Sequence, residues 1–277
     1  MDIIRIGEGF EHIVDWMQVN LKPLWSFIKL IIESLVDVTY AGLAIIPAFV
    51  LIIFVAFIAF KFVSNRMAVM TVLGLGLIYL MGYWDKTMIT LSMVLISTMI
   101  ALLIGVPTGI WSARNENVNQ VVRPILDFMQ TMPAYVYLIP AVLFFNLGTV
   151  PGVISTIIFS MPPAVRLTNL GIRQVPEEVI EAALSFGCTQ KQLLYKVQLP
   201  LAMPTILAGL NQTIMLALSM VVISAMIGAK GLGLEVYNGI TQLNIGKGFE
   251  SGLSIVILAM ILDRLTHSLG QNREMEN

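Results

Sequence analysis

Residues Pro176–Pro200 read PEEVIEAALSFGCTQKQLLYKVQLP, a long polar stretch inside an otherwise apolar chain. Pro176 suits the first turn of a helix, where the N–H group that proline lacks has no intrahelical partner. Glu177 and Glu178 would then lie at the positive end of the helix dipole. The stretch therefore predicts a polar helix that projects from the apolar part of the chain.

The same stretch predicts a turn and a second helix. Gly187 is expected to end the first helix, because glycine adopts the left-handed conformation without a Cβ clash. Thr189 can cap a second short helix, and Leu199-Pro200 would turn the chain back into an apolar run. Two helices joined by a tight glycine turn, and held between membrane spans, have the shape of a docking element.

The composition of the 277-residue chain is that of an integral membrane protein. Hydrophobic residues make up 57% and charged residues only 12%, which excludes a soluble globular domain. The net charge is −1 and no basic block is present, so nucleic acid is not an expected partner. Cys188 is the single cysteine, which excludes an intramolecular disulfide.

Apolar stretches of roughly 20 residues predict seven membrane spans. Residues 128–165 are too long for one crossing, and a turn at Gly148–Gly152 divides them into two. The predicted spans are Leu43–Phe60, Met67–Trp84, Thr87–Ala113, the two halves of Phe128–Val165, Leu201–Ala229 and Gly252–Leu269.

These spans divide the chain into four parts. Before the first span, apolar residues at helical spacing predict an amphipathic helix along the membrane interface. The predicted parts are an external N-terminal segment (1–42), two additional spans (43–84), a core of five spans (85–269) with a cytoplasmic loop at 170–203, and a cytoplasmic tail (270–277).

The positions of lysine and arginine indicate the orientation, because short cytoplasmic loops carry an excess of them. An external N-terminus and an internal C-terminus place more basic residues inside than outside. The inside set is Lys61, Arg66, Arg114, Arg123, Arg166, Arg173, Lys191, Lys196, Arg264 and Arg273, and the outside set is Arg5, Lys22, Lys29, Lys86, Lys230 and Lys247. This orientation places the loop that contains Glu181 in the cytoplasm.

Polar and aromatic residues in the apolar stretches are candidates to line a pathway, because polar groups in a membrane usually face the protein interior. Helix kinking, interhelical hydrogen bonding and ordinary packing are the alternative interpretations. The candidates are Gln130, Thr131, Tyr135 and Tyr137, close to a suspected kink at Pro133, and Asn211, Gln212 and Ser219.

No motif for catalysis is present. The sequence contains no phosphate-binding loop, no zinc-protease motif and no nucleophile elbow. We therefore predict no catalytic residue and no metal ligand, and we do not expect the chain to be an enzyme or to hold a cofactor of its own.

A pattern within the polar stretch resembles the EAA loop of ABC-importer permeases, with valine where that family usually has isoleucine. Its residues are Glu181, Ala182, Ala183, Gly187, Val197, Leu199 and Pro200. The resemblance implies that the loop fits a groove of an ATPase subunit and transmits ATP-driven motion to the membrane helices. ATP and Mg²⁺ would then be bound by that partner.

A longer resemblance, over roughly residues 84–266, is to the permeases of glycine betaine and proline betaine importers. It rests on DFMQTMPAYVYLIPAVLFFNLGTVPGV, FSMPPAVRLTNLGIRQVPEE and LNQTIMLALSMVVISAMIGAKGLG. It implies an all-helical type I importer core of five spans in a prokaryotic cytoplasmic membrane. It also implies a second permease copy, two ATPase subunits and a binding protein for a quaternary ammonium osmoprotectant, expected as a separate external chain.

The alternative hypothesis is an ATP-independent secondary transporter or channel. An ion-coupled transporter would favour carboxylates embedded in the membrane. The predicted spans hold none before Asp263. This distribution of acidic residues favours the ATP-driven importer.

Overall fold

In the computed structural model, which describes residues 6–274, every regular element is a helix. Residues 1–5 and 275–277, from the predicted N-terminal segment and C-terminal tail, lie outside the described residues. The first helices are α1 (Ile6–Asn20), α2 (Lys22–Ile45), α3 (Ala48–Phe62), α4 (Asn65–Leu80), α5 (Trp84–Arg114), α6 (Glu116–Thr131), η1 (Ala134–Tyr137) and α7 (Leu138–Phe145). The others are α8 (Thr149–Arg173), α9 (Glu177–Ser185), α10 (Gln190–Gln192), η2 (Leu193–Gln198), α11 (Leu199–Ile223), η3 (Ser224–Ile227), α12 (Leu232–Thr241) and α13 (Ile245–Glu274).

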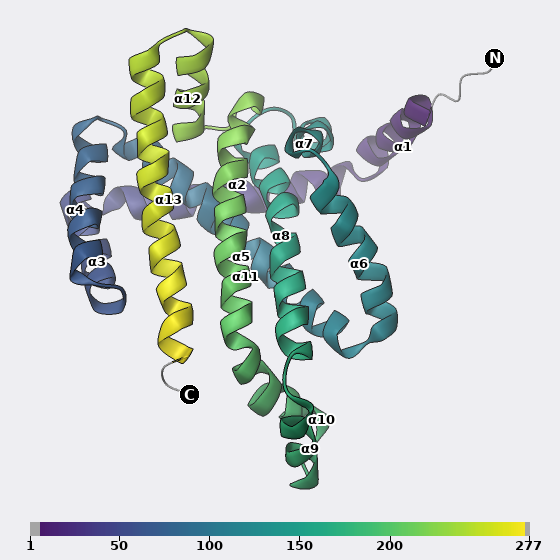
Figure 1. The fold of residues 1–277 in the computed structure, drawn as a ribbon. Coiled ribbons are helices and arrows are strands. Elements are labelled where there is room, and N and C mark those ends of the chain that lie inside the picture. The colour runs from purple at the N-terminus through teal and green to yellow at the C-terminus, as the bar shows by residue number, and fades with distance from the viewer. Residues whose placement is uncertain (1–5, 275–277) are drawn as a thin grey trace.

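Four long helical segments are apolar enough to cross a membrane. They contain α5, α8, α11 and α13, and they match the predicted spans Thr87–Ala113, the second half of Phe128–Val165, Leu201–Ala229 and Gly252–Leu269. In Figure 1, α13, α11 and α8 run side by side, with α9 and α10 projecting from one end of the bundle and α12 standing at the other. The predicted all-helical membrane fold is confirmed.

Small residues allow α5 and α8 to pack closely. A Cβ atom added at Gly105 would lie 2.9 Å from the Cβ of Ala164, and one added at Gly109 would lie 2.7 Å from the Cβ of Thr168. Residues four apart share one face of a helix, so these two glycines form a continuous groove on α5. Glycine at such positions lets two helix backbones approach in a membrane, where packing rather than the hydrophobic effect joins helices.

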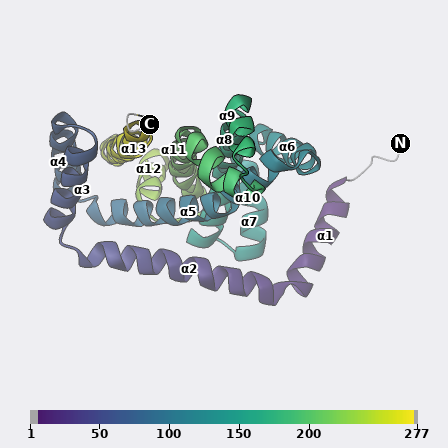
Figure 2. The same ribbon diagram turned by 90° about the horizontal axis from the view of Figure 1, so that it is seen from below.

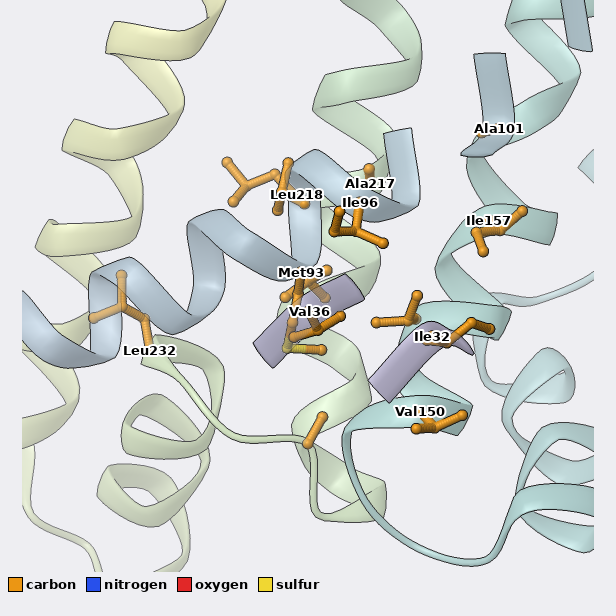
Figure 3. Packing of buried hydrophobic residues seen from close by; sticks show 14 of the residues in the cluster. Ile32, Val36, Met93, Ile96, Ala101, Val150, Ile157, Ala217, Leu218 and Leu232 are labelled. Atoms are coloured by element: carbon orange, nitrogen blue, oxygen red, sulfur yellow. The ribbon is translucent and has the colours of Figure 1, made fainter. Parts of the chain in front are cut away.

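The N-terminal helix α2 packs across this bundle. Its buried residues Ile32 and Val36 join a core cluster with Met93 of α5 and Val150 of α8 (Figure 3). Figure 2 shows α2 and α5 as two layers beside the row formed by α13, α11 and α8. The other face of α2 is exposed and apolar at Phe27, which suits contact with lipid.

The first predicted span, Leu43–Phe60, needs a correction, because α2 continues into it as far as Ile45. The helix axis then turns by 98° before α3. Ile46 is extended, with ψ 123°, because the ring of Pro47 disfavours a helical conformation in the preceding residue. The helix break therefore lies at Ile46-Pro47 and not at residue 42.

The two additional spans form a short helical hairpin of α3 and α4. These helices have 15 and 16 residues, which gives lengths of about 22–24 Å against a hydrocarbon thickness of about 30 Å. The hydroxyl of Ser64 accepts a hydrogen bond from the N–H of Met67 and caps α4. The predicted spans Leu43–Phe60 and Met67–Trp84 are longer than α3 and α4, because they were predicted from the apolar stretches alone.

The predicted span between residue 128 and the Gly148 turn is also not straight. The helix axis turns by 109° between α6 and the η1–α7 segment. Met132 is extended, with ψ 134°, directly before Pro133, so the suspected kink is a complete break. The following turn ends at Gly148, and Pro151 and Gly152 belong to α8, not to the turn.

The number of crossings stays a prediction. The described residues contain four helical segments of sufficient length, two bent pairs that pass the same test together, and the shorter apolar helix α4. Seven crossings require that each bent pair and α4 span the membrane once.

Candidate functional site: the loop between α8 and α11

The polar stretch forms the predicted helix, which is α9. Pro176 was expected in the first turn but is the N-cap residue, in an extended conformation, and Glu177 and Glu178 occupy the first turn as predicted. The side chains of α9 are all exposed or half-buried. The helix therefore stands free of the bundle, and local sequence rather than tertiary packing fixes its ends.

Gly187 ends α9 as predicted, with a left-handed φ of +79°. Its N–H donates to the carbonyl oxygen of Leu184 at 2.9 Å, and the N–H of Cys188 donates to that of Ala183 at 3.2 Å. This pair of bonds is the Schellman motif, which satisfies the last carbonyl groups of a helix. An added Cβ at Gly187 would meet nothing within 4 Å, so backbone conformation alone explains the glycine.

Thr189 caps the second helix, as predicted. Its hydroxyl accepts from the N–H of Gln192, and the side-chain oxygen of Gln192 accepts from the N–H of Thr189 at 2.9 Å, which makes a capping box. The expected turn at Leu199-Pro200 is wrong, because α10, η2 and α11 form one helical run from Gln190 to Ile227. The π-helical turn η2 places the N–H of Leu199 on the carbonyl of Leu194, five residues back, and its wider backbone accommodates Pro200 within the run.

The second half of the loop is anchored to the bundle. Leu193 and Leu194 are buried, and Leu194 packs with Ile172 of α8 and Ala202 of α11. Gly171 brings the two helices together there, because an added Cβ would lie 3.2 Å from the Cβ of Ala202. The second half of the loop is therefore packed directly against α8 and α11.

The free side of the loop exposes apolar side chains. Phe186 is 90% exposed and Tyr195 is 67% exposed. Val179 and Leu184 on α9 are also exposed. Exposed apolar side chains on a polar projection are typical of a surface that contacts another protein.

The motif residues divide between the two parts of the loop. Glu181, Ala182 and Ala183 lie in the middle of α9, and the carbonyl of Glu181 accepts a hydrogen bond from the hydroxyl of Ser185 at 2.9 Å. Val197 lies in η2, and Leu199 and Pro200 begin α11. The first group is therefore on the projecting helix, and the second is where the loop joins the bundle.

A polar cluster beside the loop was not predicted. Asn169 of α8 donates to the hydroxyl of Ser112 at 2.9 Å and to the side-chain oxygen of Asn119 at 3.3 Å. Arg173 pairs with Glu116 at 2.7 Å, and it also donates to the carbonyl of Ser112 at 3.2 Å. These contacts join α5, α6 and α8 at the end from which the loop emerges.

The cluster borders a cavity of about 510 Å³ between α6 and α8, and a second ion pair there joins Arg166 to Asp127. A signal for the cluster exists in the sequence. Arg166, Asn169 and Arg173 follow one another at steps of three and four on α8, so they share one helix face. The sequence does not identify the residues that pair with these three, because those partners lie 39 to 57 positions away along the chain.

The candidate pathway residues near Pro133 have two different environments. Gln130, Thr131 and Tyr135 are exposed, and they lie together at the break between α6 and η1. Tyr137 is buried, its hydroxyl donates to the carbonyl of Met129, and its ring packs edge-on against Phe159. Tyr137 therefore has the packing role that was the alternative interpretation.

The candidate pathway residues on α11 also have two different environments. Gln212 and Ser219 are exposed and lie seven residues apart, on one stripe of the helix. Asn211 faces α13, where it donates to Asp263 at 3.1 Å and accepts from the hydroxyl of Thr266. Interhelical hydrogen bonding thus accounts for Asn211, and a pathway role for the exposed residues stays a prediction.

The end of the bundle opposite the loop carries an ionic cluster. Glu235 of α12 is 13% exposed and pairs with Lys247 at 2.7 Å and with Lys86 at 3.4 Å. The hydrogen bond from Lys247 is the main cause that lowers the pKa of the Glu235 carboxyl below its usual range. These contacts fix α12 between the beginnings of α5 and α13.

Family comparison agrees with this geometry. Residues 105–272 match the family described as binding-protein-dependent transport system inner membrane components. The match covers more than half of the chain, and it includes α8, the loop and α11. The chain belongs to this family, and it is the membrane permease component of an ABC import system.

Individual relatives match almost the whole chain. It is 49% identical over 266 residues to the glycine betaine transport system permease protein OpuAB of Bacillus subtilis, covering 96% of this chain and 94% of that protein. It is 48% identical over 259 residues to the glycine betaine/proline betaine permease ProW of Escherichia coli, covering 94% of this chain and 73% of that protein. It is 47% identical over 278 residues to the glycine betaine/carnitine permease GbuB of Listeria monocytogenes, covering 99% of this chain and 98% of that protein.

Solved structures show the same fold at lower identity. The inward-facing MetNI methionine ABC transporter matches with a TM-score of 0.62 and 21% identity, covering 66% of this chain and 92% of that chain. At this identity, the likeness concerns the fold alone. The chain therefore shares the fold of that transporter chain.

Proposed function

We propose that this chain is the permease subunit of an ATP-driven importer of glycine betaine or a related quaternary ammonium solute. The loop geometry carries the proposal, because α9 has no buried residue and projects from the bundle, while Leu194 packs against Ile172 of α8 and Ala202 of α11. The substrate class is supported by relatives of 47–49% identity, which are named for glycine betaine transport.

We further propose the assembly in which this subunit acts. A second copy of the chain, two cytoplasmic ATPase subunits and a separate external binding protein would complete the importer within the lipid membrane. The exposed Phe186 and Leu184 would contact the ATPase, which would bind ATP and Mg²⁺. This chain would contribute no catalytic group.

The mechanism that follows is alternating access. ATP binding would close the ATPase pair and move the loops, and the loops would move α8 and α11 through the contact of Leu194 with Ile172 and Ala202. Hydrolysis would reset the permease. Binding protein and ATP need only stabilise different states of the permease pair to make transport directional.

The proposed orientation in the prokaryotic cytoplasmic membrane has the N-terminus outside and the C-terminus inside. Cys188 in the loop is the single cysteine, so it reports directly on this orientation. In intact spheroplasts, an impermeant maleimide should leave Cys188 unlabelled and should label a Cys188→Ser, Leu243→Cys variant. Labelling of Cys188 from outside would contradict the orientation.

Uptake by a reconstituted complex tests the function. Proteoliposomes that contain the permease with its ATPase and binding protein should accumulate labelled glycine betaine only when ATP is present. Uptake without ATP would contradict the ATP-driven importer. ATP-dependent uptake of methionine or a sugar, with betaine ignored, would contradict only the substrate class.

A further inference from the structure

A cavity at the end of the bundle opposite the loop carries charges of both signs. Its volume is about 500 Å³, and it lies between α2, the α7–α8 turn and the segment after α11. Its charged lining residues are Lys29, Glu33 and Asp37 of α2 and Lys230. Its aromatic lining residues are Tyr40 and Phe145.

The sequence of α2 builds one wall of this cavity. Lys29, Glu33 and Asp37 follow one another at steps of four, so they form a polar stripe along one face of the helix. The neighbouring face holds the buried Ile32 and Val36, which fix the rotation of α2 against α5 and α8. The polar stripe is therefore held toward the cavity by the packing of the core.

These charges have no partner among the residues that the structure describes. In the part of the chain that the structure describes, none of the side chains of Lys29, Glu33, Asp37 and Lys230 makes an ion pair or a hydrogen bond. Glu235, at the same end of the bundle, has two lysine partners. Glu33, Asp37 and Lys230 are exposed, so their charges are accessible to a molecule that enters the cavity.

The lining is complementary to a zwitterion. The carboxylates of Glu33 and Asp37 attract a cationic nitrogen, and Tyr40 and Phe145, which also line the cavity, supply aromatic rings of the kind that attract an ammonium group. Lys230 attracts an anionic group. The first residue of the 25-residue helix α8, Thr149, also lines the cavity, so the positive end of the helix dipole adds to that attraction.

We propose that this cavity binds a zwitterion, with its cationic nitrogen at Glu33 and Asp37 and its anionic group at Lys230. Two sources supply this chemistry: a free betaine and the headgroup of an aminophospholipid. The first source rests on the proposed function, whereas the second does not.

Cysteine protection tests the site in the complete complex. In a Cys188→Ser background, Leu147→Cys places a reporter in the lining, where Leu147 is 71% exposed. Leu243→Cys is the matched control, because Leu243 is 87% exposed at the same end of the bundle and does not line this cavity. The rate of modification by an impermeant thiosulfonate is measured in nanodiscs of phosphatidylglycerol alone, with and without glycine betaine.

We expect betaine to slow modification of the Leu147→Cys reporter at a saturable concentration, with no effect on the control. Asp37→Asn and Lys230→Gln should each raise the half-protecting concentration by about tenfold, because each removes one charged contact. Slow modification in phosphatidylethanolamine nanodiscs without betaine would instead assign the zwitterion to a lipid headgroup.

Equal modification rates in both lipids, with and without betaine, would overturn the site. ATP-dependent betaine uptake is measured with the same preparation. If uptake proceeds while protection is absent, the cavity proposal fails and the importer stands. If uptake is absent while phosphatidylethanolamine protects the reporter, the cavity proposal stands without the proposed function.

Discussion

The side-chain amide of Asn211 lies 3.1 Å from the carboxylate of Asp263, although 52 residues separate them in sequence. This hydrogen bond joins α11 to α13 between two apolar helix surfaces. Thr266 donates to the oxygen of the same amide, so both ends of the Asn211 side chain are satisfied. The contact therefore fixes the position of α13 against the helix that carries the loop.

Breaking this contact should loosen α13. We expect Asn211→Ala and Asp263→Ala to be non-additive, with a coupling of about 0.5–2 kcal/mol, because the residues are in direct contact. Thermal unfolding of both single variants and the double variant in detergent measures the coupling. Ser219→Ala, an exposed position on α11, is the control, and additive effects of the two substitutions would contradict the contact.

The close approach of α5 and α8 makes a second prediction. Gly109→Ala should destabilise the protein by about 1–3 kcal/mol, because the new Cβ would lie 2.7 Å from both Thr168 and the carbonyl of Val165. Gly76→Ala in α4 is the matched control, since a Cβ there meets nothing within 4 Å. Alanine favours a helix over glycine by about 1 kcal/mol, so the control should have an unchanged or raised melting temperature. Equal melting temperatures for the two variants would contradict the packing.

The ionic cluster at Glu235 predicts a dependence of stability on pH. Its folded-state pKa is lowered from the ordinary value of 4.5, so its contribution is present above that value and is lost as the pH falls through the folded pKa. Melting temperatures between pH 7 and pH 3 should therefore fall less steeply for Glu235→Gln than for the wild type. Asp15→Asn, at an exposed position on α1, is the control and should keep the wild-type slope. An unchanged slope for Glu235→Gln would show that the cluster contributes no pH-dependent stability.

The sequence predicts the loop well because its determinants are local. Pro176, Gly187 and Thr189 each act within four residues of their own position, through a missing N–H, a positive φ and a capping box. Backbone chemistry of this kind needs no knowledge of the rest of the fold. The same reasoning misplaced Pro200, because the π-helical turn Leu193–Gln198 that continues the helix through this position leaves no local signal of that kind.

The sequence predicts less about the direction of the helix axes and about which side chains contact one another. Hydropathy shows which residues are apolar but not where a helix axis turns. The 98° bend at Pro47 and the 109° bend at Pro133 therefore were not predicted, and the helices there are shorter than the predicted spans. Asn211 is a polar residue in an apolar stretch, and this pattern fits both a pathway-lining residue and an interhelical hydrogen bond. Only the spatial position of Asp263 assigns it to an interhelical contact.

We propose that the loop couples the ATPase to the membrane helices, and a substitution in the turn at Gly187 tests this coupling. Gly187→Leu places a bulky side chain at φ +79°, which costs about 1 kcal/mol or more and distorts the turn after α9. Gly187→Asn is the control, because asparagine tolerates the left-handed conformation. Both variants should insert into the membrane normally.

The measurement is ATP hydrolysis in proteoliposomes, with and without binding protein loaded with glycine betaine. We expect loaded binding protein to stimulate hydrolysis in the wild type and in Gly187→Asn but not in Gly187→Leu. Wild-type stimulation in Gly187→Leu, at equal amounts of inserted permease, would contradict the coupling role of the loop.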